Sequence, residues 1–237
     1  PSPKHMNNPQ AVKIGNVRFY HYGYLNEVID AKNKRNRNMD LIQKELDKKP
    51  DSSFMLFNMG NEYYAMAQYE KALKYYMRSY ENFVPQEGFS SKLILRLVSC
   101  NQILRNFEEE YKFINKGLEY YPNFTELEFM RGNTLVGQGK YLEAINSLNK
   151  CIEMGESPIE IRELIGVGSY RTYYTLCNVY FDLRDYDKAL YYCDKTLKVN
   201  PKYIKAFSKF PQIMGIKKFS IGEMKSKLDS YLDVNTD

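Results

Sequence analysis

Few residues of this 237-residue chain have the types and spacing that catalysis or metal binding requires. The four cysteines contain no C-x-x-C pair and have no histidine near them in the sequence, which argues against a zinc site. We interpret them as reduced cysteines of a helical core: Cys100, Cys151, Cys177 and Cys193. The two histidines, His5 and His21, form no serine–histidine–acid or cysteine–histidine arrangement. The sequence therefore predicts no complete catalytic site of its own.

Two short motifs invite a chemical interpretation, and each has a simpler structural one. Three carboxylates come close together at Asp182, Asp185 and Asp187, as they would in a metal site. They fall at a turn between two expected helices, where one aspartate would cap the second helix, and we favour the cap. The pair Gly166 and Gly168 has two of the three glycines of a nucleotide-binding loop, but no clear strand precedes it. We favour a turn there.

The elements that position these residues follow from an internal repeat. Its units share a small residue, then an aromatic residue that opens the second helix, then an alanine early in that helix. The small residues are Gly60, Gly132 and Cys177, and the alanines are Ala72, Ala144 and Ala189. The aromatic residues, at intervals of 38, 34 and 45 residues, are Tyr69, Phe107, Tyr141 and Tyr186. This pattern resembles the tetratricopeptide repeat (TPR) family, whose unit has two antiparallel helices in about 34 residues.

The resemblance implies an all-α fold, a right-handed TPR solenoid of about four helix pairs plus capping helices. The small residue and the alanine let the two helices of a pair approach closely. Each pair then leaves an apolar face that only its neighbour can cover, so several pairs must stack. Pro122 and Pro201 close two of the repeats, where the second helix must stop. The second repeat departs from the pattern, with Val98 and Glu110 at the two small positions.

The repeat spacing also predicts the domain organisation. Within a repeat region of residues 51–201, we expect the four units at residues 52–85, 90–122, 125–155 and 170–201. Two units carry insertions, of four residues near positions 85–88 and of eleven within positions 155–170. Before the repeats we expect a strand and loop up to residue 24, and then a linker helix over residues 25–50 with a bend or break at residues 33–38. Residues 202–237 are expected to form capping helices at 202–209 and 221–232, the first limited by Pro211 and Gly215.

The inner face of a TPR stack, lined by the first helices, is where partners of this family usually bind. Its ninth repeat position holds Asn61, Ser99, Asn133 and Asn178. An asparagine amide can hold the backbone of an extended peptide, although asparagine is also common at this position. The members that clamp a C-terminal carboxylate have lysine where this chain has Phe57 and Ala65, which argues against a chaperone-tail clamp. We predict a partner groove that includes Phe57, Asn61, Tyr64, Asn133, Tyr174 and Asn178.

A second resemblance comes from the segment before the repeats. The stretch Phe19-Tyr-His-Tyr-Gly-Tyr-Leu25 is followed by Lys34-Arg-Asn36 and then by the repeats. This order, and the insertion at residues 166–170, resemble a bacterial group in which a family 2 glycosyltransferase domain of GT-A fold precedes TPR helices. The match covers about residues 17–207. It implies that residues 1–24 are the end of a truncated catalytic domain.

This second resemblance also implies roles for three residues. His21 would lie near the Mn²⁺ or Mg²⁺ ion and the nucleotide diphosphate, and Lys34 and Arg35 could face the diphosphate. The alternative is that His21 and the basic cluster only join two domains. The nucleotide-binding strands and the aspartate-x-aspartate motif of such a domain are not in this sequence. We therefore expect this chain alone to hold no cofactor and to bind a nucleotide sugar only with the missing domain.

Charge and hydropathy restrict the partners. The net charge of +5 is too mild to argue for nucleic acid. Residues 1–37 and 198–227 carry +5 and +7, and residues 38–197 carry −4. Such basic ends could meet phosphate, an acidic partner or a membrane surface, but solvated lysines on exposed helix faces are the simpler explanation. No apolar run approaches a membrane span and no signal peptide opens the chain, so we expect a cytoplasmic location.

Three hypotheses about function follow. The leading one is that the chain is the TPR region of a bacterial family 2 glycosyltransferase, where it presents the acceptor or mediates protein contacts. The alternative is a free-standing TPR adaptor that binds a peptide or protein in its concave groove. A third is a module that pairs into a homodimer, because exposed repeat ends and tyrosine-rich faces can associate.

Overall fold

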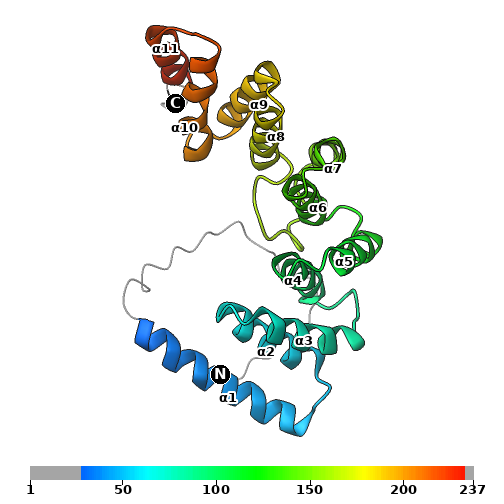
Figure 1. Cartoon of the computed structure of the whole chain (residues 1–237). Helices are drawn as coiled ribbons and strands as arrows, with labels where there is room; N and C mark the ends of the chain where they lie inside the picture. Colours follow the sequence, from blue (N-terminus) through cyan, green and yellow to red (C-terminus); the bar gives the residue numbers. More distant parts are fainter. Residues whose placement is uncertain (1–27, 233–237) are drawn as a thin grey trace, which may run out of the picture. The chain divides into compact units, whose positions relative to one another are not determined.

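The computed structural model describes residues 28–232, in which the regular elements are all α-helices and no strand is present (Figure 1). In chain order the helices are α1 (Val28–Lys48), α2 (Ser53–Ala65), α3 (Tyr69–Glu81), α4 (Ser90–Ile103), α5 (Phe107–Tyr120), α6 (Thr125–Gly137), α7 (Tyr141–Met154), α8 (Tyr170–Asp182), α9 (Tyr186–Val199), α10 (Ile204–Ile216) and α11 (Ile221–Leu232). The predicted all-α fold is confirmed. The strand expected before residue 24 lies outside the described residues.

The chain divides into two compact units, Pro1–Leu41 and Ile42–Asp237. The described part of the first unit is α1 as far as Leu41. The bend or break expected at residues 33–38 is wrong, because α1 runs without interruption from Val28 to Lys48. The segment contains neither glycine nor proline, so nothing in its backbone interrupts the helical hydrogen bonds.

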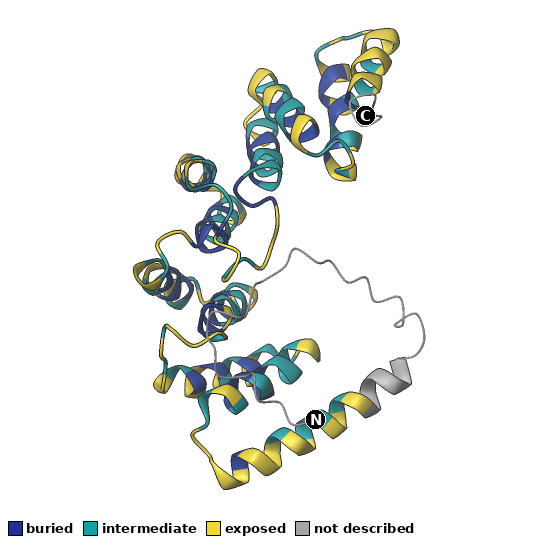
Figure 2. Cartoon of the chain, turned by 180° about the vertical axis from the view of Figure 1, so that it is seen from behind, coloured by how far each residue is buried: buried dark blue, intermediate teal, exposed yellow. Residues whose placement is uncertain are grey.

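In the second unit, consecutive helices pack as pairs, and each pair packs on the next. The pairs are α2–α3, α4–α5, α6–α7 and α8–α9, and α10 packs against α9. They fall in the four ranges where the repeat spacing places helix pairs. Figure 2 shows the buried residues along the faces that meet neighbouring helices. A stacked architecture of this kind buries its core between neighbours, one repeat at a time.

The small residues Gly60 and Gly132 lie where the two helices of a pair are in close contact. A Cβ atom added to Gly60 would lie 2.5 Å from the Tyr76 ring, and one added to Gly132 would lie 2.9 Å from Leu148. The partner positions Ala72, Ala144 and Ala189 are completely buried. The structure therefore confirms the close approach of paired helices that the repeat pattern predicts.

The second repeat has larger residues at the two positions where the helices of a pair pack closely. Val98 and Glu110 replace the glycine and the alanine, and both are completely buried. The Glu110 Oε1 atom accepts hydrogen bonds from Thr134 Oγ1 of α6 at 2.5 Å and from Gln102 Nε2 of α4 at 3.3 Å. Glu110 therefore joins α5 to the first helices of two successive repeats.

The C-terminal cap differs from its prediction. We expected Pro211 to limit the first capping helix, but α10 continues through it to Ile216. A proline inside a helix costs about 3 kcal/mol. The apolar side chains Phe210, Ile213 and Met214 are buried around it, and burial of each contributes about 1.5–3 kcal/mol. Burial on this face therefore outweighs the cost of the proline.

A buried tyrosine fixes α11 to the last repeat. The Tyr231 hydroxyl donates to Asp194 Oδ1 of α9 at 2.5 Å, and its ring packs edge-on against Phe210. Burial raises the pKa of Asp194, but hydrogen bonds from Lys198 and Tyr231 outweigh this effect and hold the pKa below its ordinary value. Asp194 is therefore ionised at neutral pH and accepts a charge-assisted bond from Tyr231.

We expect Tyr231→Phe to lower the free energy of unfolding by about 1.5 kcal/mol, because it removes a hydrogen bond to a charged acceptor and keeps the ring. Urea denaturation at pH 7 measures the change. Tyr191→Phe, at a half-exposed tyrosine of α9, is the matched control and should change stability by less than about 0.5 kcal/mol. Equal effects of the two substitutions would contradict a role of Tyr231 in holding α11.

Candidate functional site

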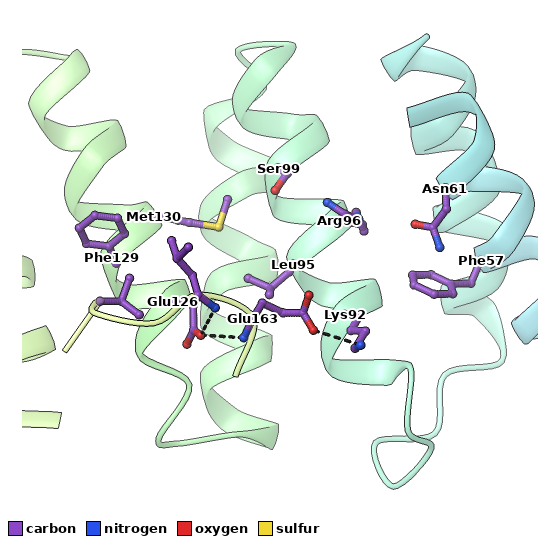
Figure 3. A pocket seen from close by; sticks show the side chains of 12 residues that line it. Phe57, Asn61, Lys92, Leu95, Arg96, Ser99, Glu126, Phe129, Met130 and Glu163 are labelled. Carbon is purple, nitrogen blue, oxygen red and sulfur yellow. Dashed lines mark hydrogen bonds and ion pairs between the residues drawn. The ribbon is translucent and has the colours of Figure 1, made fainter. Parts of the chain in front are cut away.

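The first helices of the first three repeats enclose a cavity of about 440 Å³ (Figure 3). Helix α4 contributes the largest share of its lining, with Lys92, Leu95, Arg96 and Ser99. These residues are spaced i, i+3, i+4 and i+7, so they form one stripe along the helix. The corresponding stripes come from α2, with Phe57 and Asn61, and from α6, with Glu126, Phe129 and Met130. The loop of residues 155–169, which joins α7 to α8, closes one side.

The cavity combines an apolar lining with a charged rim. Phe57, Leu95, Phe129 and Met130 supply aromatic and aliphatic surface. Lys92 Nζ lies 3.2 Å from the Glu163 carboxylate of the loop, so this cation is already paired. An apolar cavity with a few fixed polar groups is the usual form of a binding site for a small ligand or an anchoring side chain.

Arg96, the second cation of the cavity, contacts an aromatic ring and not a carboxylate. Its guanidinium lies 4.7 Å from the ring centroid of Tyr64, which is a cation–π contact. Among the described residues, no aspartate or glutamate forms an ion pair with it. A guanidinium that rests on an aromatic face can still donate from its edge, in a geometry that matches a carboxylate.

Glu126 is an acidic residue of the cavity that faces the loop. Its side chain is buried, and its Oε1 atom accepts hydrogen bonds from the backbone N–H groups of Glu163 at 2.9 Å and Leu164 at 3.1 Å. The Ser157 hydroxyl donates to Oε2. Figure 3 shows Glu126 and Glu163 meeting at the loop. Both carboxylate oxygens are therefore satisfied, as a buried charge requires.

The Gly166 to Gly168 segment forms a turn immediately before α8, as predicted. The Gly166 N–H donates to Glu156 Oε2 at 2.9 Å. A phosphate-binding loop needs backbone N–H groups directed at its ligand, whereas this one is directed at a carboxylate of the same loop. The positive φ of +91° at Gly166 is the backbone conformation that favours glycine there.

The structure brings together only part of the predicted partner groove. Phe57 and Asn61 line the cavity, and Tyr64 lies beneath Arg96. The Asn61 Oδ1 atom accepts a bond from the Tyr76 hydroxyl at 2.8 Å, so part of its amide serves the helix pair. Asn133 is half-buried on α6 and does not line the cavity.

Two more predicted groove residues belong to a different part of the fold. Tyr174 packs edge-on against Tyr203, with ring centroids 5.3 Å apart, in the core around α8, α9 and α10. The Asn178 side-chain amide donates to the Tyr174 carbonyl at 3.1 Å. Neither residue lines the cavity.

Two of the residues predicted from the glycosyltransferase resemblance, Lys34 and Arg35, belong to the first unit. Lys34 is exposed and Arg35 is half-buried, both on α1. His21 lies outside the described residues. Among residues 28–232, no group of three histidine, cysteine or acidic side chains is placed to hold a metal ion.

Sequence reasoning missed Lys92, Arg96 and Glu126, which supply most of the charge of the cavity. A signal for them was present. Phe57 and Asn61 occupy repeat positions five and nine, and a helix places positions two and six on the same stripe. Lys92 and Arg96 are positions two and six of the second repeat, and Glu126 is position two of the third. The repeat register does not show which of these charged side chains form ion pairs with each other.

Two other sequence predictions are confirmed. All four cysteines are free and buried, and burial raises the pKa of the Cys100 thiol to about 12. The Asp185 carboxylate caps α9 by accepting the Lys188 backbone N–H at 3.1 Å, and this bond lowers its pKa. Neither group therefore needs a catalytic explanation. Within the described part of the chain, no helix is long and apolar enough to cross a lipid bilayer.

Comparisons with known proteins identify the repeats. Family models described as tetratricopeptide repeat match residues 55–82, 129–156 and 170–203. These segments overlap the first, third and fourth expected units. No curated protein sequence matches the chain significantly.

Solved structures share the fold at low identity. YrrB, described as a TPR protein with an unusual peptide-binding site, has a TM-score of 0.57 and 19% identity over 76% of this chain and 85% of its own. MamA from Desulfovibrio magneticus RS-1 has a TM-score of 0.56 and 15% identity over 79% and 98%. PilF of Pseudomonas aeruginosa has a TM-score of 0.53 and 15% identity over 72% and 71%. Together with the matched repeats, these likenesses show that the chain contains tetratricopeptide repeats and folds as an all-α TPR solenoid.

Proposed function

We propose that this chain is a protein-interaction scaffold that binds a peptide segment of a partner protein in the cavity between α2, α4 and α6. The observation that carries the proposal is the arrangement of Arg96 beside apolar side chains. The apolar lining suits an aliphatic or aromatic anchor, and Arg96 suits a carboxylate near that anchor. A TPR fold is consistent with a scaffold.

The electrostatics of the cavity favour an acidic ligand over a basic one. Lys92 is neutralised by Glu163, and Glu126 has its oxygens satisfied by the loop. The charge left to meet a ligand is that of Arg96. A ligand carboxylate would be paired on entry, whereas a lysine or arginine of a ligand would lose its hydration without gaining a partner.

The comparison with YrrB supports this choice over the glycosyltransferase hypothesis. YrrB is described by its peptide-binding site, and it shares the fold over most of both chains. The matches to family models lie in the repeats. A free-standing adaptor is therefore the better supported of the two hypotheses.

The test uses peptides selected from a random library displayed on phage. We expect Arg96→Ala to raise the dissociation constants of the selected peptides by at least about tenfold, because a charge-assisted hydrogen bond in a half-buried site is lost. Fluorescence anisotropy with the synthetic peptides measures the change. Arg78→Ala is the matched control, since Arg78 also lies over a tyrosine ring, that of Tyr75, but outside the cavity. Selection of no peptide, or equal effects of the two substitutions, would reject the cavity as the binding site.

A double variant distinguishes the cavity from a longer groove. Asn133→Ala combined with Asn178→Ala changes two predicted groove residues that do not line the cavity. Binding limited to the cavity should be unaffected by this variant. Binding along the whole inner face should be weakened, because both amides would face the peptide backbone.

The glycosyltransferase hypothesis remains a second candidate because of one observation, the His21-Tyr-Gly-Tyr24 segment with Lys34-Arg-Asn36 after it. It predicts that the native product carries a preceding domain with an aspartate-x-aspartate motif and that residues 1–237 alone turn over no nucleotide sugar. The intact mass of the native product is the measurement. A product that begins at or near Pro1 would reject this candidate.

A further inference from the structure

The insertion that the repeat spacing revealed is folded against the cavity. Residues 155–169 leave α7, cross to the N-terminal ends of α6 and α4, and return to begin α8. We propose that this loop is a fixed wall, held by Glu126 as a positioning residue, and that it limits the binding site to α2, α4 and α6. This inference rests on the proposed function and adds to it the length of ligand that the site accepts.

The partners of Glu126 single it out. Every hydrogen bond that its carboxylate accepts comes from the loop: the Ser157 hydroxyl and the N–H groups of Glu163 and Leu164. Ser157 is itself buried, and its oxygen accepts the Thr125 N–H at 2.9 Å. A buried charge is costly unless it is fully hydrogen-bonded. Here the loop supplies the bonds that a buried Glu126 needs, so the two depend on each other.

Glu128 provides the contrast on the same helix. Its side chain is as buried as that of Glu126, but it pairs with Lys150 of α7 at 3.2 Å and with Arg131 of α6 at 3.6 Å. Neither of these partners belongs to the loop. The chain thus offers two buried glutamates two positions apart on one helix, one bound to the loop and one not.

Further contacts hold the loop in one conformation. Glu163 pairs with Lys92 of α4, and the Thr125 hydroxyl donates to the Gly155 carbonyl at 2.7 Å. Gly168 packs on the backbone of Gly155 so closely that a Cβ atom there would lie 2.1 Å from the Gly155 carbonyl carbon. The two ends of the loop therefore meet backbone to backbone. These contacts show that the loop packs as a defined part of the fold.

The position of the loop decides which helices a ligand reaches. Its side chains Glu163, Leu164 and Val167 line the cavity, whereas no residue of α8 does. Three neighbouring helices with axes about 8–10 Å apart span roughly 20 Å. An extended peptide rises about 3.3 Å per residue, so the site should accommodate about six residues. Longer ligands would meet the wall.

The first test needs no ligand. We expect Glu126→Ala to accelerate amide hydrogen exchange at Glu163 and Leu164 by about tenfold or more, since both N–H groups lose a charged acceptor. Glu126→Gln should restore most of the protection, because it keeps an oxygen for these groups. Glu128→Ala, the matched control, should leave both exchange rates unchanged. Unchanged rates in Glu126→Ala, or equal acceleration in both alanine variants, would overturn the role of Glu126.

The second test measures the length of the site. Nested synthetic peptides of roughly four to twelve residues, derived from those selected with the wild-type protein, are titrated by fluorescence anisotropy. Affinity should stop rising at about six residues in the wild type and at a greater length in Glu126→Ala. The same limiting length in both would overturn the wall. If the selection yields no peptide, the proposed function fails, while the exchange experiment still decides whether Glu126 holds the loop.

Discussion

Replacing Gly60 with alanine is expected to lower the free energy of unfolding by about 2 kcal/mol. The new Cβ atom would lie 2.5 Å from Cε1 of Tyr76, closer than two carbon atoms can approach. The Tyr76 ring is completely buried, and its hydroxyl is bonded to Asn61 at 2.8 Å, so the ring cannot move away freely. Overpacking of this kind costs up to about 3 kcal/mol. The gain of about 1 kcal/mol in helix propensity offsets part of it.

The control is a second helical glycine, at which an added Cβ atom would contact no other residue. Gly137 ends α6, and a Cβ atom there would meet nothing within 4 Å. Gly137→Ala should therefore stabilise the chain by about 0.5 kcal/mol, because alanine reduces the conformational entropy of the unfolded chain. Urea denaturation of both variants at pH 7 gives the two values. Changes of the same sign would show that the Gly60–Tyr76 contact does not govern the packing of α2 on α3.

The second prediction concerns Glu110, which should make stability depend on pH. Burial raises its pKa above the ordinary value of 4.5, and hydrogen bonds from Thr134 and Gln102 only partly oppose this effect. Its Oε2 atom is buried without a hydrogen-bond partner among the described residues. We expect Glu110→Gln to stabilise the chain at pH 7 by about 1–2 kcal/mol, since a charged group with an unsatisfied oxygen is replaced by a neutral one.

The sign of the pH dependence follows from the direction of the shift. Well below pH 4.5 the carboxyl is protonated in both the folded and the unfolded chain, so the stabilities of wild type and variant should differ least at the acidic end of the range. As the pH rises, the unfolded chain loses its proton first, and the wild type loses stability until the pH passes the raised pKa of the folded state. Urea denaturation from pH 4 to pH 8 measures the difference between the two proteins. A difference that does not change with pH would show that Glu110 keeps its ordinary pKa.

Glu110 also connects this titration to the cavity. It lies on α5, and its two hydrogen-bond partners lie on α4 and α6, the helices that carry most of the cavity lining. The same position is an alanine in the other three repeats, Ala72, Ala144 and Ala189. In the second repeat the carboxyl thus replaces a simple helix contact with a polar link between two first helices.

The repeat architecture could be predicted because its requirements fall on single positions. A close approach between two helices needs a small residue at one point, and Gly60, Gly132 and Cys177 mark those points directly. The helix-opening aromatic residues and Pro122 mark where helices begin and end. These constraints are local, since a solenoid repeats one short-range packing arrangement. The same locality explains why the Asp185 cap could be foreseen.

The cavity could be predicted only in part, because its character depends on contacts between distant residues. The sequence indicated that Phe57 and Asn61 face the groove and that residues 155–170 contain an insertion. It did not indicate that the insertion folds back onto the beginning of α6. There Glu126 accepts hydrogen bonds from Ser157 and Leu164, which follow it by 31 and 38 positions in the sequence. Nor did it show that Lys92 is neutralised by Glu163 while Arg96 rests on Tyr64.

Pro211 illustrates the same division between local and tertiary effects. Taken locally, a proline should end the first capping helix, yet α10 continues to Ile216 because burial of the surrounding apolar side chains outweighs the lost hydrogen bond. The sequence by itself determined the repeats, their helices and their close contacts, which depend on neighbours along the chain. The tertiary structure decided the wall of the cavity, the pairing of its charges and the burial of Glu110, because each depends on groups that only the stacking of repeats brings together.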